Sequence, residues 1–572
     1  MGRTAALFSS LDVPRRLGTL TATERRLWRA FPQGELVDLR VGDPALDDPA
    51  QADHWPAERS VRGEVLAALL LGASQAAVGA VAVVRLTGAR ITGGLRITHG
   101  QVSFPFLLQG CRFDGTVDLD GAVTESIDLS GSRLTAISAY GAQVRGTLDL
   151  DDTVVTGGTR AVYADGIRIE GNLSVERARV TGSFTLINAQ ITGRAKFIDA
   201  KLTNTAPGGE ALNAGGMRLG RSLLAQGLQT KGELRMPGAH IGSSLHLNGA
   251  TLDGLGRTAL HADSLTVASE AVFRPRGTGE DAQPFRAIGT VRVPGAKFGN
   301  GLDLRGAQLS PTPGAPALRA GRIVVEGNLL LGQDFRTDGD IRLTGARITG
   351  HLDLTGMASP NALLSLHTAT AENGIRDDIH SWPGRLNLDG LSYGSFSEYL
   401  DARQRLTLLL SRQVRQSDGS AGGFRAQPYE QLAGYYRSLG SDGEARTVLL
   451  AKQRALRGVL PWGRRIPGYL LDLLVGYGYR PLRAIGWAVG LLAAGSVYFG
   501  QVRPQHVSAE DTSVFNPVIY TADHLIPVIH FGEADVWQYH GAPAVVTIVL
   551  TVLGWTLGIA IAAAATRTFT RN

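Results

Sequence analysis

Residues 85–93 read RLTGARITG, and residues 342–350 repeat the same nine residues without a change. In each copy, two apolar residues alternate with polar ones, then come Gly-Ala, one further apolar residue and a closing Gly. Diverged copies recur at intervals of about 11 residues, which is typical of a repeat architecture. They occupy residues 116–126, 147–157, 172–182, 183–193, 233–242, 244–254, 290–300, 301–310 and 385–394.

This repeat predicts short strands that stack on one another. Alternation with a period of two indicates a strand with one buried face, and Gly at the strand end permits the positive φ of a tight corner. Since so short a strand cannot bury its apolar face alone, it must stack on a neighbouring copy. We therefore predict a mainly β fold, a right-handed parallel β-solenoid over residues 81–394. Two repeat units would make one coil, with about a dozen coils spaced by ~4.8 Å.

The repeat resembles the pentapeptide-repeat and bactofilin solenoids, because a small residue (Ala89) precedes a large one (Ile91) by two positions. The large apolar positions Leu86, Ile91, Ile97 and Val102 advance by alternating steps of five and six. A strict five-residue period is therefore absent, and the cross-section of the coil stays open. The resemblance implies a fold and no particular activity.

Helices are expected before the solenoid, in residues 1–80. Thr21-Ala22-Thr23-Glu24 is a capping box that opens an amphipathic helix to Arg29. Pro56-Ala57-Glu58 is typical of a second helix start, which would end at Gly72. That helix would place Val61, Val65, Leu66 and Leu69 on one face. Together these segments would form a helical N-terminal cap over the first edge of the solenoid.

Residues 395–465 are expected to form a helical connector. Ser397–Gln416 is consistent with one helix, followed by a flexible stretch at 417–423. Pro428–Leu439 and Glu444–Arg457 then form a predicted helical hairpin, which resembles one tetratricopeptide-like unit.

Residues 466–572 are predicted to be a juxtamembrane segment followed by a two-helix membrane anchor. Residues 484–500 and 541–566 are uncharged and mostly apolar. A span needs about 20 helical residues, so the spans are placed at 482–502 and 541–566, with Arg483 reaching the headgroups. Residues 466–479 would lie along the membrane interface. The pairs Gly486/Gly490 and Gly554/Gly558 have the spacing that lets helices pack closely.

Flanking charge predicts the orientation of this anchor. Residues 446–483 carry eight Lys or Arg, and Arg567 and Arg571 follow the second span, whereas the loop 501–540 carries Arg503 against five acidic residues. Both termini are therefore predicted in the cytoplasm and the loop 501–540 outside. The first residues hold too short an apolar run for a cleavable signal peptide. A net charge of +6 over 572 residues gives no reason to expect nucleic acid.

No motif of a known catalytic centre is present in the sequence. The glycines fall at solenoid corners, without the strand–helix context that a dinucleotide-binding Gly-x-Gly-x-x-Gly needs. No Walker loop, His-Glu-x-x-His or nucleophile elbow occurs. We therefore predict no enzyme, no catalytic, cofactor-binding or metal-binding residues and no cofactor. The single Cys111 excludes intrachain disulfides and is predicted to be a small core residue.

Histidines and surface charges offer weaker signals. His506, His524, His530 and His540 lie in the loop 501–540 beside Asp523, Glu533 and Asp535. Such a group could bind a divalent metal or sense external pH, but its spacing matches no metal pattern, and a solvated polar loop is favoured. Charged residues alternate along the solenoid and would stack into ladders from coil to coil. These ladders would be either a solvated face or an elongated docking surface for another protein. The charged residues are Asp118, Asp128, Asp149, Asp303, Asp353, Arg96, Arg235, Arg305 and Arg342. Scattered solenoid histidines, His99, His240, His246, His261 and His351, are interpreted as surface variation.

The C-terminal run resembles a group of bacterial, actinobacterial-type membrane proteins through QPYEQLA (427–433), GYGYRP (476–481) and NPVIYTADHLIP (516–527). Members often carry the label "membrane-associated oxidoreductase", which implies a redox enzyme. The sequence, however, contains no binding motif for flavin or nicotinamide. Our leading hypothesis is a membrane-anchored cytoplasmic scaffold that presents the solenoid to a protein partner or large assembly. The alternatives are that oxidoreductase, a self-polymerising bactofilin-like scaffold, which would be a homo-oligomer, and a two-span channel or sensor. The last lacks a Thr-Val-Gly-Tyr-Gly filter between its spans.

Overall fold

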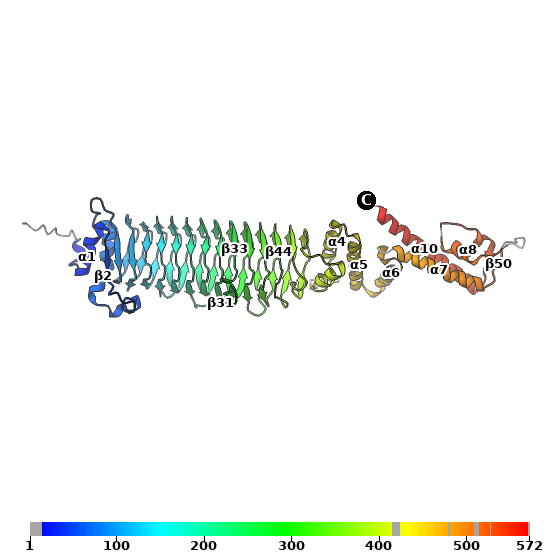
Figure 1. Ribbon diagram of the computed structural model, residues 1–572, viewed down its shortest axis with the longest axis horizontal. Helices are drawn as coiled ribbons and strands as arrows, with labels where there is room; N and C mark the ends of the chain where they lie inside the picture. Colours follow the sequence, from blue (N-terminus) through cyan, green and yellow to red (C-terminus); the bar gives the residue numbers. More distant parts are fainter. Residues whose placement is uncertain (1–13, 414–423, 479–480, 508–513, 527, 570–572) are drawn as a thin grey trace, which may run out of the picture. The chain divides into compact units, whose positions relative to one another are not determined.

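The structure, a computed structural model, describes residues 14–413, 424–478, 481–507, 514–526 and 528–569. The chain divides into two units, Met1–Tyr399 with Arg412–Val414, and Leu400–Ser411 with Arg415–Asn572. The first is a parallel β-solenoid of about 13 turns, and the second is helical (Figure 1). The predicted parallel solenoid, with helices following it, is therefore confirmed.

Each coil of the solenoid has four sides. Strands β6 (Phe106–Gln109), β7 (Arg112–Phe113), β8 (Val117–Asp118) and β9 (Val123–Thr124) form one coil. The next strand, β10 (Ile127–Asp128), pairs in parallel with β6 and so begins the following coil. Because each repeat unit supplies two strands, two units make one coil, as predicted.

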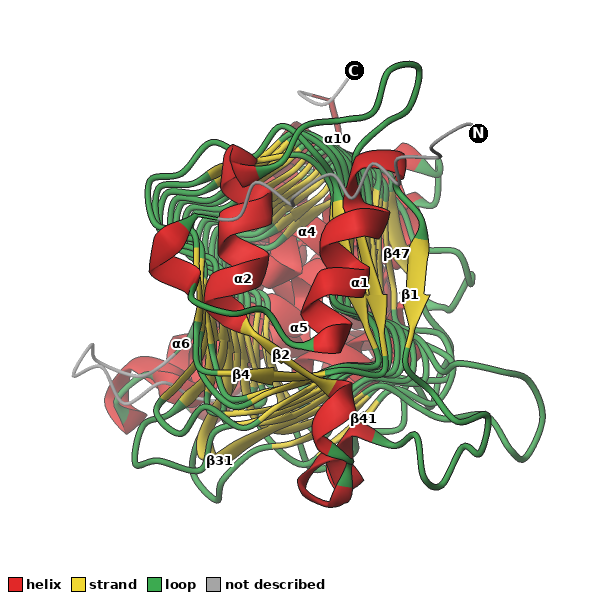
Figure 2. Cartoon of the chain, turned by 90° about the vertical axis from the view of Figure 1, so that its left-hand side faces the viewer, coloured by secondary structure: helices red, strands yellow, loops and turns green. Residues whose placement is uncertain are grey.

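Three hydrogen-bonded sheets cover the four sides. Side 1 is a 14-stranded sheet from β1 (Leu36–Asp38) to β47 (Gly374–Arg376), and side 4 is a 12-stranded sheet from β9 to β49 (Ser392–Tyr393). A 23-stranded sheet covers sides 2 and 3, because β31 (Thr251–His261) and β34 (Arg286–Arg292) run from one side onto the next. In Figure 2, β1 and β47 lie on one side of the coil, and β4 and β41 lie on the neighbouring side 2.

Side 2 carries the site described below. Its strands are β2 (Ser60–Arg62), β4 (Arg90–Thr92), β7, β11 (Arg133–Leu134), β15 (Val154–Val155), β19 (Arg179–Thr181), β23 (Lys201–Thr203), β27 (Gln229–Lys231), the first parts of β31 and β34, β37 (Gln308–Ser310) and β41 (Arg336–Thr337). Side 3 begins at β5 (Leu95–Arg96) and ends at β48 (Arg385–Asn387).

Inward-facing apolar residues stack from coil to coil and form a continuous core. On side 1, Ile127 pairs with Leu148 and Leu148 with Leu173, and all three are buried. The coils differ in length, because the coil that separates Ala271 from its partner Leu302 is longer than the one that separates Ile127 from Leu148. The core register is nevertheless kept, because the extra residues leave the coil as loops.

Two kinds of glycine shape the corners. The Gly of the Gly-Ala pair takes a positive φ, as at Gly345 (φ 67°), which L residues disfavour. The closing Gly of the repeat is needed for a different reason, close approach of the backbone. A Cβ at Gly193 would lie 2.3 Å from the Gly171 carbonyl oxygen, and one at Gly242 would lie 2.4 Å from the Gly220 oxygen. Neighbouring coils leave no room for a side chain at these closing glycines.

The N-terminal cap combines helices with strands of the solenoid. Helix α1 (Ala22–Ala30) begins with the predicted capping box. The prediction of a helix from Pro56 is wrong at its start: residues 57–59 form a 3-10 turn, and α2 (Gly63–Ala68) begins only after β2. Val61 pairs with Ile91 in the sheet, so cross-coil pairing outweighs the local helix signal. Short 3-10 turns lie at Arg15–Leu17, Phe31–Gln33 and Pro49–His54, and α2 continues into a wide turn at Leu69–Ala73.

The second unit is built from helices. Helix α3 (Ala402–Arg405) with the turn Leu406–Leu410 is shorter than the predicted helix 397–416. The stretch 417–423 lies outside the described residues. The predicted hairpin is confirmed as α4 (Gln427–Ser438) and α5 (Asp442–Val459), and α6 (Trp462–Val475) and the turn Gly476–Gly478 follow.

Two further helices of this unit, α7 (Pro481–Gln501) and α10 (Ala542–Phe569), are long and apolar enough to cross a membrane. They coincide with the predicted spans. Between them lie β50 (Gln505–His506), α8 (Pro517–Leu525), α9 (Glu533–Val536) and β51 (Trp537–Gln538).

Candidate functional site

A column of basic side chains follows side 2 of the solenoid. The first residue of each side-2 strand pairs with the first residue of the strands above and below it. Arg90 pairs with Arg112 and Arg112 with Arg133, and beyond one Val154 come Arg179 and Lys201, which also pair. We call Arg90, Arg112, Arg133, Arg179 and Lys201 the basic column.

Strand alternation directs these side chains outward. The next residues along three of these strands, Ile91, Phe113 and Leu134, are buried in the core, so the basic residues before them face solvent. Successive coils are ~4.8 Å apart. Five cations therefore lie within six consecutive coils on one side.

Most of the basic column is not neutralised. Arg90 forms ion pairs with Asp114 (2.9 Å) and Asp53 (3.2 Å). Among the residues that the structure describes, no carboxylate pairs with Arg112, Arg133, Arg179 or Lys201. Like charges directly opposite on a sheet are destabilising. The column thus costs stability and produces a positive field along side 2.

Side 3 shows the contrasting arrangement, in which stacked charges are balanced. His261 lies between Glu233 (3.1 Å) and Asp263 (3.3 Å), and the guanidinium of Arg292 also binds Asp263. Burial alone would raise the pKa of Asp263, but Arg292 and His261 outweigh it and lower that pKa. Arg235 on the same side pairs with Glu210 (3.4 Å). Arg292, Arg319 and Arg342 also stack on this side. Because Arg292 pairs with Asp263 and Arg342 with Asp340 (3.0 Å), side 3 balances more of its stacked charge than side 2 does.

The predicted Asp and Arg ladders are realised only in part. Asp128 stacks directly on Asp149 on side 1, where burial, followed by the nearby Asp151 and Asp128, raises the pKa of Asp149. Arg96 stacks on Asp118 on side 3 at 3.8 Å. Asp303 instead binds Arg305, two residues along the same turn. The basic column on side 2 is a further ladder, which sequence reasoning missed.

Loops line the edge between sides 2 and 3. Three of the longer coils leave the core there, at residues 204–209, 254–258 and 311–317. Neighbouring loops touch, since the Thr312 hydroxyl donates a hydrogen bond to the Gly256 carbonyl (2.7 Å). Open hollows form beside them, one lined by residues 205–209 with Arg257 and another by 308–315 with Arg336. The basic column thus runs beside an uneven, loop-built edge.

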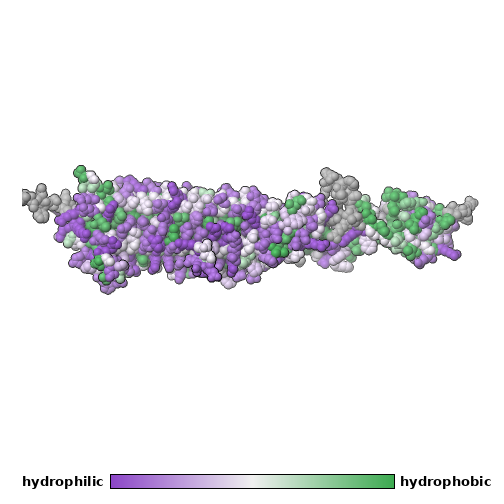
Figure 3. Space-filling model, in the orientation of Figure 1, coloured by the Kyte–Doolittle hydropathy of each residue, from purple (hydrophilic) through white to green (hydrophobic). Residues whose placement is uncertain are grey.

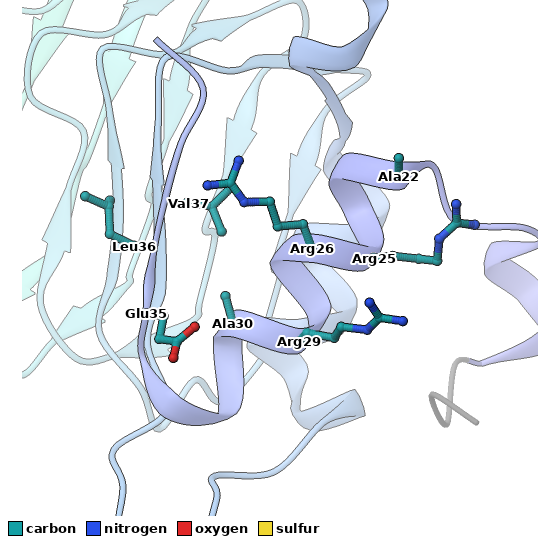
Figure 4. Close-up of a pocket in the computed structure, with 8 residues that line it drawn as sticks. All are labelled: Ala22, Arg25, Arg26, Arg29, Ala30, Glu35, Leu36 and Val37. Atoms are coloured by element: carbon teal, nitrogen blue, oxygen red, sulfur yellow. The ribbon is translucent and has the colours of Figure 1, made fainter. Parts of the chain in front are cut away.

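A second basic surface lies on the N-terminal cap. Arg25, Arg26 and Arg29 occupy the exposed face of α1, next to a shallow hollow that Glu35 and the half-exposed Leu36 also line. Figure 4 shows Arg26 reaching toward β1, whereas Arg25 and Arg29 point away from it. This surface repeats the positive character of the basic column at the start of the solenoid.

Cys111 is a core residue, as predicted. It is fully buried, and its thiol donates a hydrogen bond to the Gln109 carbonyl (3.3 Å). Burial raises its pKa to about 12. At neutral pH the group is therefore a thiol, and a nucleophilic role has no support.

The loop histidines do not converge on one point. His506 contacts Trp537 with the two rings tilted and their centroids 3.7 Å apart, and His524 contacts Tyr520 and Thr551. The His530 ring, 90% exposed, lies 3.7 Å from the buried Asp523. In the part of the chain that the structure describes, no group of three or more His, Cys, Asp or Glu could hold a metal ion.

Sequence reasoning also missed an aromatic cluster between the two long helices. It consists of Phe499, Phe515, Tyr520, Trp537 and Tyr539. The Tyr539 hydroxyl donates to the Val502 carbonyl (3.0 Å), which joins the cluster to the end of α7. Asn516-Pro517 could have indicated α8, since Asn is a common N-cap and Pro a common first helical residue. The Asn516 side chain indeed accepts a bond from the Val518 amide (3.0 Å).

No protein-family model, curated protein or solved structure matches this chain. The fold and the basic column therefore carry the functional conclusion alone.

Proposed function

We propose that this protein is a membrane-anchored scaffold that presents side 2 of its solenoid to an acidic protein partner. The observation that carries the proposal is the basic column, four of whose five cations have no carboxylate partner among the described residues. A chain that folds around stacked, unneutralised arginines loses stability. A partner that supplies carboxylates would recover that loss on binding.

The apolar surface of α7 and α10 supports the membrane part of the proposal. Trp487 (43% exposed), Val552 (57%) and Trp555 (54%) lie on the outside of these helices. Figure 3 shows hydrophobic surface over this part of the chain. Each Å² of apolar surface removed from water contributes about 25 cal/mol, and a contiguous patch of this kind marks a membrane or protein contact.

The orientation proposed for the anchor follows the basic residues before α7. Arg454 and Arg457 lie on α5, where both bind Asp472 of α6, and their guanidiniums lower the pKa of Asp472. Arg464, Arg465 and the C-terminal arginines add further positive charge. Because such residues stay in the cytoplasm, the proposed orientation has the solenoid in the cytoplasm. Gln501 and Ala542, the helix ends that the segment 501–540 joins, then face the outside.

A protein partner fits side 2 better than single-stranded nucleic acid does. Single-stranded nucleic acids are held by aromatic platforms next to basic grooves, and the outward positions of the described side-2 strands hold no aromatic residue. Threonines such as Thr92, Thr181 and Thr203 occupy outward positions beside the basic column instead. Their hydroxyls can bind backbone and carboxylate groups. An acidic, extended protein segment is the ligand that these groups favour.

Charge reversal on side 2 tests this proposal. We expect the triple variant Arg112→Glu, Arg133→Glu, Arg179→Glu to lose a partner that in-cell crosslinking captures with the native chain. The matched control reverses Arg168, Arg218 and Arg347 on side 4, which have neutral neighbours in the adjacent coils. This control variant has the same net charge as the side-2 variant and should still bind the partner. Equal loss in both variants, or capture of only lipid and the chain itself, would refute a docking role for side 2.

The other hypotheses from the sequence remain open to simple tests. End-to-end polymerisation has less support, because α1 and α2 form a helical cap before the first full coils. The oxidoreductase rests on resemblance alone. The absorbance spectrum of the purified protein would reveal a bound flavin or haem.

A further inference from the structure

The segment between the two apolar helices folds back along them. A Cβ at Gly495 of α7 would lie 2.4 Å from the Thr521 side chain of α8. Helix α8 also contacts α10. The Tyr520 hydroxyl of α8 lies 3.5 Å from the Thr547 hydroxyl of α10, and a Cβ at Gly554 of α10 would lie 2.3 Å from the Leu525 carbonyl oxygen of α8. Helix α8 therefore packs against both long helices, and Gly495 and Gly554 are small because it does (Figure 1).

These contacts place the carboxyl end of α8 deep along α10. Helix α10 begins at Ala542, and Gly554 lies well inside it. At a rise of 1.5 Å per residue, these two residues are ~18 Å apart along the helix axis. The hydrocarbon core of a bilayer is about 30 Å thick. If α10 crosses a membrane, Leu525 lies near the middle of that core.

The chain then turns back at the same depth. The buried Asp523 carboxylate accepts hydrogen bonds from the amides of Phe531 (2.9 Å) and Ala534 (2.9 Å). These bonds hold the returning segment beside α8. Irregular backbone at membrane depth is tolerated only where it is buried in protein or lines a water-filled space.

The tip of this turn is exposed in a single copy of the chain. Val528 is 87% exposed, Ile529 51% and Phe531 49%, and the His530 side chain between them is 90% exposed. An imidazole facing lipid at this depth would lose its hydrogen bonds to water, which is costly. Ionisable residues at such depth almost always face a protein interior or a water-filled cavity. Lipid alone is therefore a poor neighbour for the tip.

Helix α7 offers a second face, at Gly486 and Gly490, that no described residue covers. Gly486 and Gly490 have no described atom within 4 Å of an added Cβ. This pair, predicted to pack helices, does not pack against α10 or α8. Small residues spaced by four are typical of contacts between membrane helices.

We propose, on the basis of the membrane anchorage above, that α8 is a re-entrant half-helix and that copies of this chain meet around its tip, where His530 lines a water-filled path. The apolar residues Val528, Ile529 and Phe531 would then contact neighbouring copies. The Gly486/Gly490 face would allow a second copy to approach α7.

Single-cysteine variants test this arrangement in native membrane vesicles. Cys111 is the only cysteine, so Cys111→Ala provides the background. The tip variants are Val528→Cys and His530→Cys. Gln505→Cys, in the exposed strand β50, reports water, and Val552→Cys, on the outer face of α10, reports lipid. Each is exposed to oxidative crosslinking, to a small cationic thiosulfonate and to a bulky impermeant maleimide.

We expect Val528→Cys to form disulfide-linked dimers. His530→Cys should react with the small reagent and resist the bulky one, while Gln505→Cys reacts with both and Val552→Cys with neither. Tip cysteines that react with the bulky maleimide as fast as Gln505→Cys would overturn the proposal, because the tip would lie outside the membrane. Tip cysteines that neither crosslink nor react would overturn it too, because lipid would cover them. Reaction at Val552→Cys would instead contradict the membrane anchorage itself.

Discussion

Glu24 links the N-terminal helix to the first coil of the solenoid. Its carboxylate, fully buried, accepts hydrogen bonds from Arg62 (2.8 and 2.9 Å) and from the Thr21 amide (2.9 Å). Burial alone would raise the pKa of Glu24, but the bonds from Arg62 and Thr21 outweigh it, and that pKa is lowered. A carboxyl with a lowered pKa in the folded state stabilises the fold above its unfolded pKa of about 4.3.

The stabilisation from Glu24 should therefore be complete at neutral pH and be lost as pH falls from about 4.3 through the lowered pKa. We expect Glu24→Gln to destabilise the cap by about 1–3 kcal/mol at pH 7, because Arg62 loses its charged partner. The variant should lose less stability than the native chain on acidification. Hydrogen exchange of residues 60–62, corrected for intrinsic rates, measures both effects. Glu64→Gln is the control, since Glu64 also binds Arg62 but is 58% exposed. Equal effects of the two variants would contradict the role of burial.

Gly242 tests why the repeat ends in glycine. A Cβ there would meet the Gly220 carbonyl oxygen at 2.4 Å, so Gly242→Ala must push two coils apart. We expect a loss of about 1–3 kcal/mol, the usual cost of overpacking. Gly321→Ala is the matched control, because its Cβ would lie 3.6 Å from the nearest atom, an ordinary contact. Thermal unfolding of both variants followed by circular dichroism compares them, and similar melting temperatures would refute the close-approach argument.

At the scale of elements, the sequence period alone predicted the strands. Each short strand alternates apolar and polar residues, and this pattern recurs about every 11 residues. It could not predict that residues 60–62 are a strand, since Ile91, the partner of Val61, is distant from it in the sequence. The basic column was hidden for a related reason. Coil lengths vary along the chain, so the spacing between stacked residues differs between Arg112 and Arg133 and between Val154 and Arg179. Only the pairing register brings them together.

The packing of helix α8 could not be predicted from the sequence either, because its contacts Gly495 and Gly554 lie before and after it in the chain, on two different helices. We expect Gly495→Val to displace α8, since the added atoms would overlap Thr521. Amide exchange of residues 517–525, measured in detergent, should rise at least tenfold, and Ala493→Val, on an exposed position of the same helix, should leave it unchanged. Unaltered exchange in Gly495→Val would show that α8 is not held at this contact.

The whole solenoid is quasi-one-dimensional, since each coil contacts only its neighbours. Deletion of residues 127–147 would remove one coil and keep every register. Ile127 pairs with both Phe106 and Leu148, so those two would pair directly, and the other three sides follow in the same way. The corresponding junctions would be Arg112 with Val154, Val117 with Val162, and Val123 with Arg168.

We therefore expect this one-coil deletion to leave a folded solenoid with a cooperative melting transition close to that of the native chain. Deletion of only residues 127–136 removes fewer residues but two of the four sides of a coil, so the strands that follow would meet the wrong partners. That shorter deletion should abolish the transition in circular dichroism or lower it by more than about 10 °C, which for a domain of this size corresponds to several kcal/mol. If the shorter deletion were tolerated and the longer one were not, stability would depend on contacts beyond neighbouring coils, and the one-dimensional description of this fold would fail.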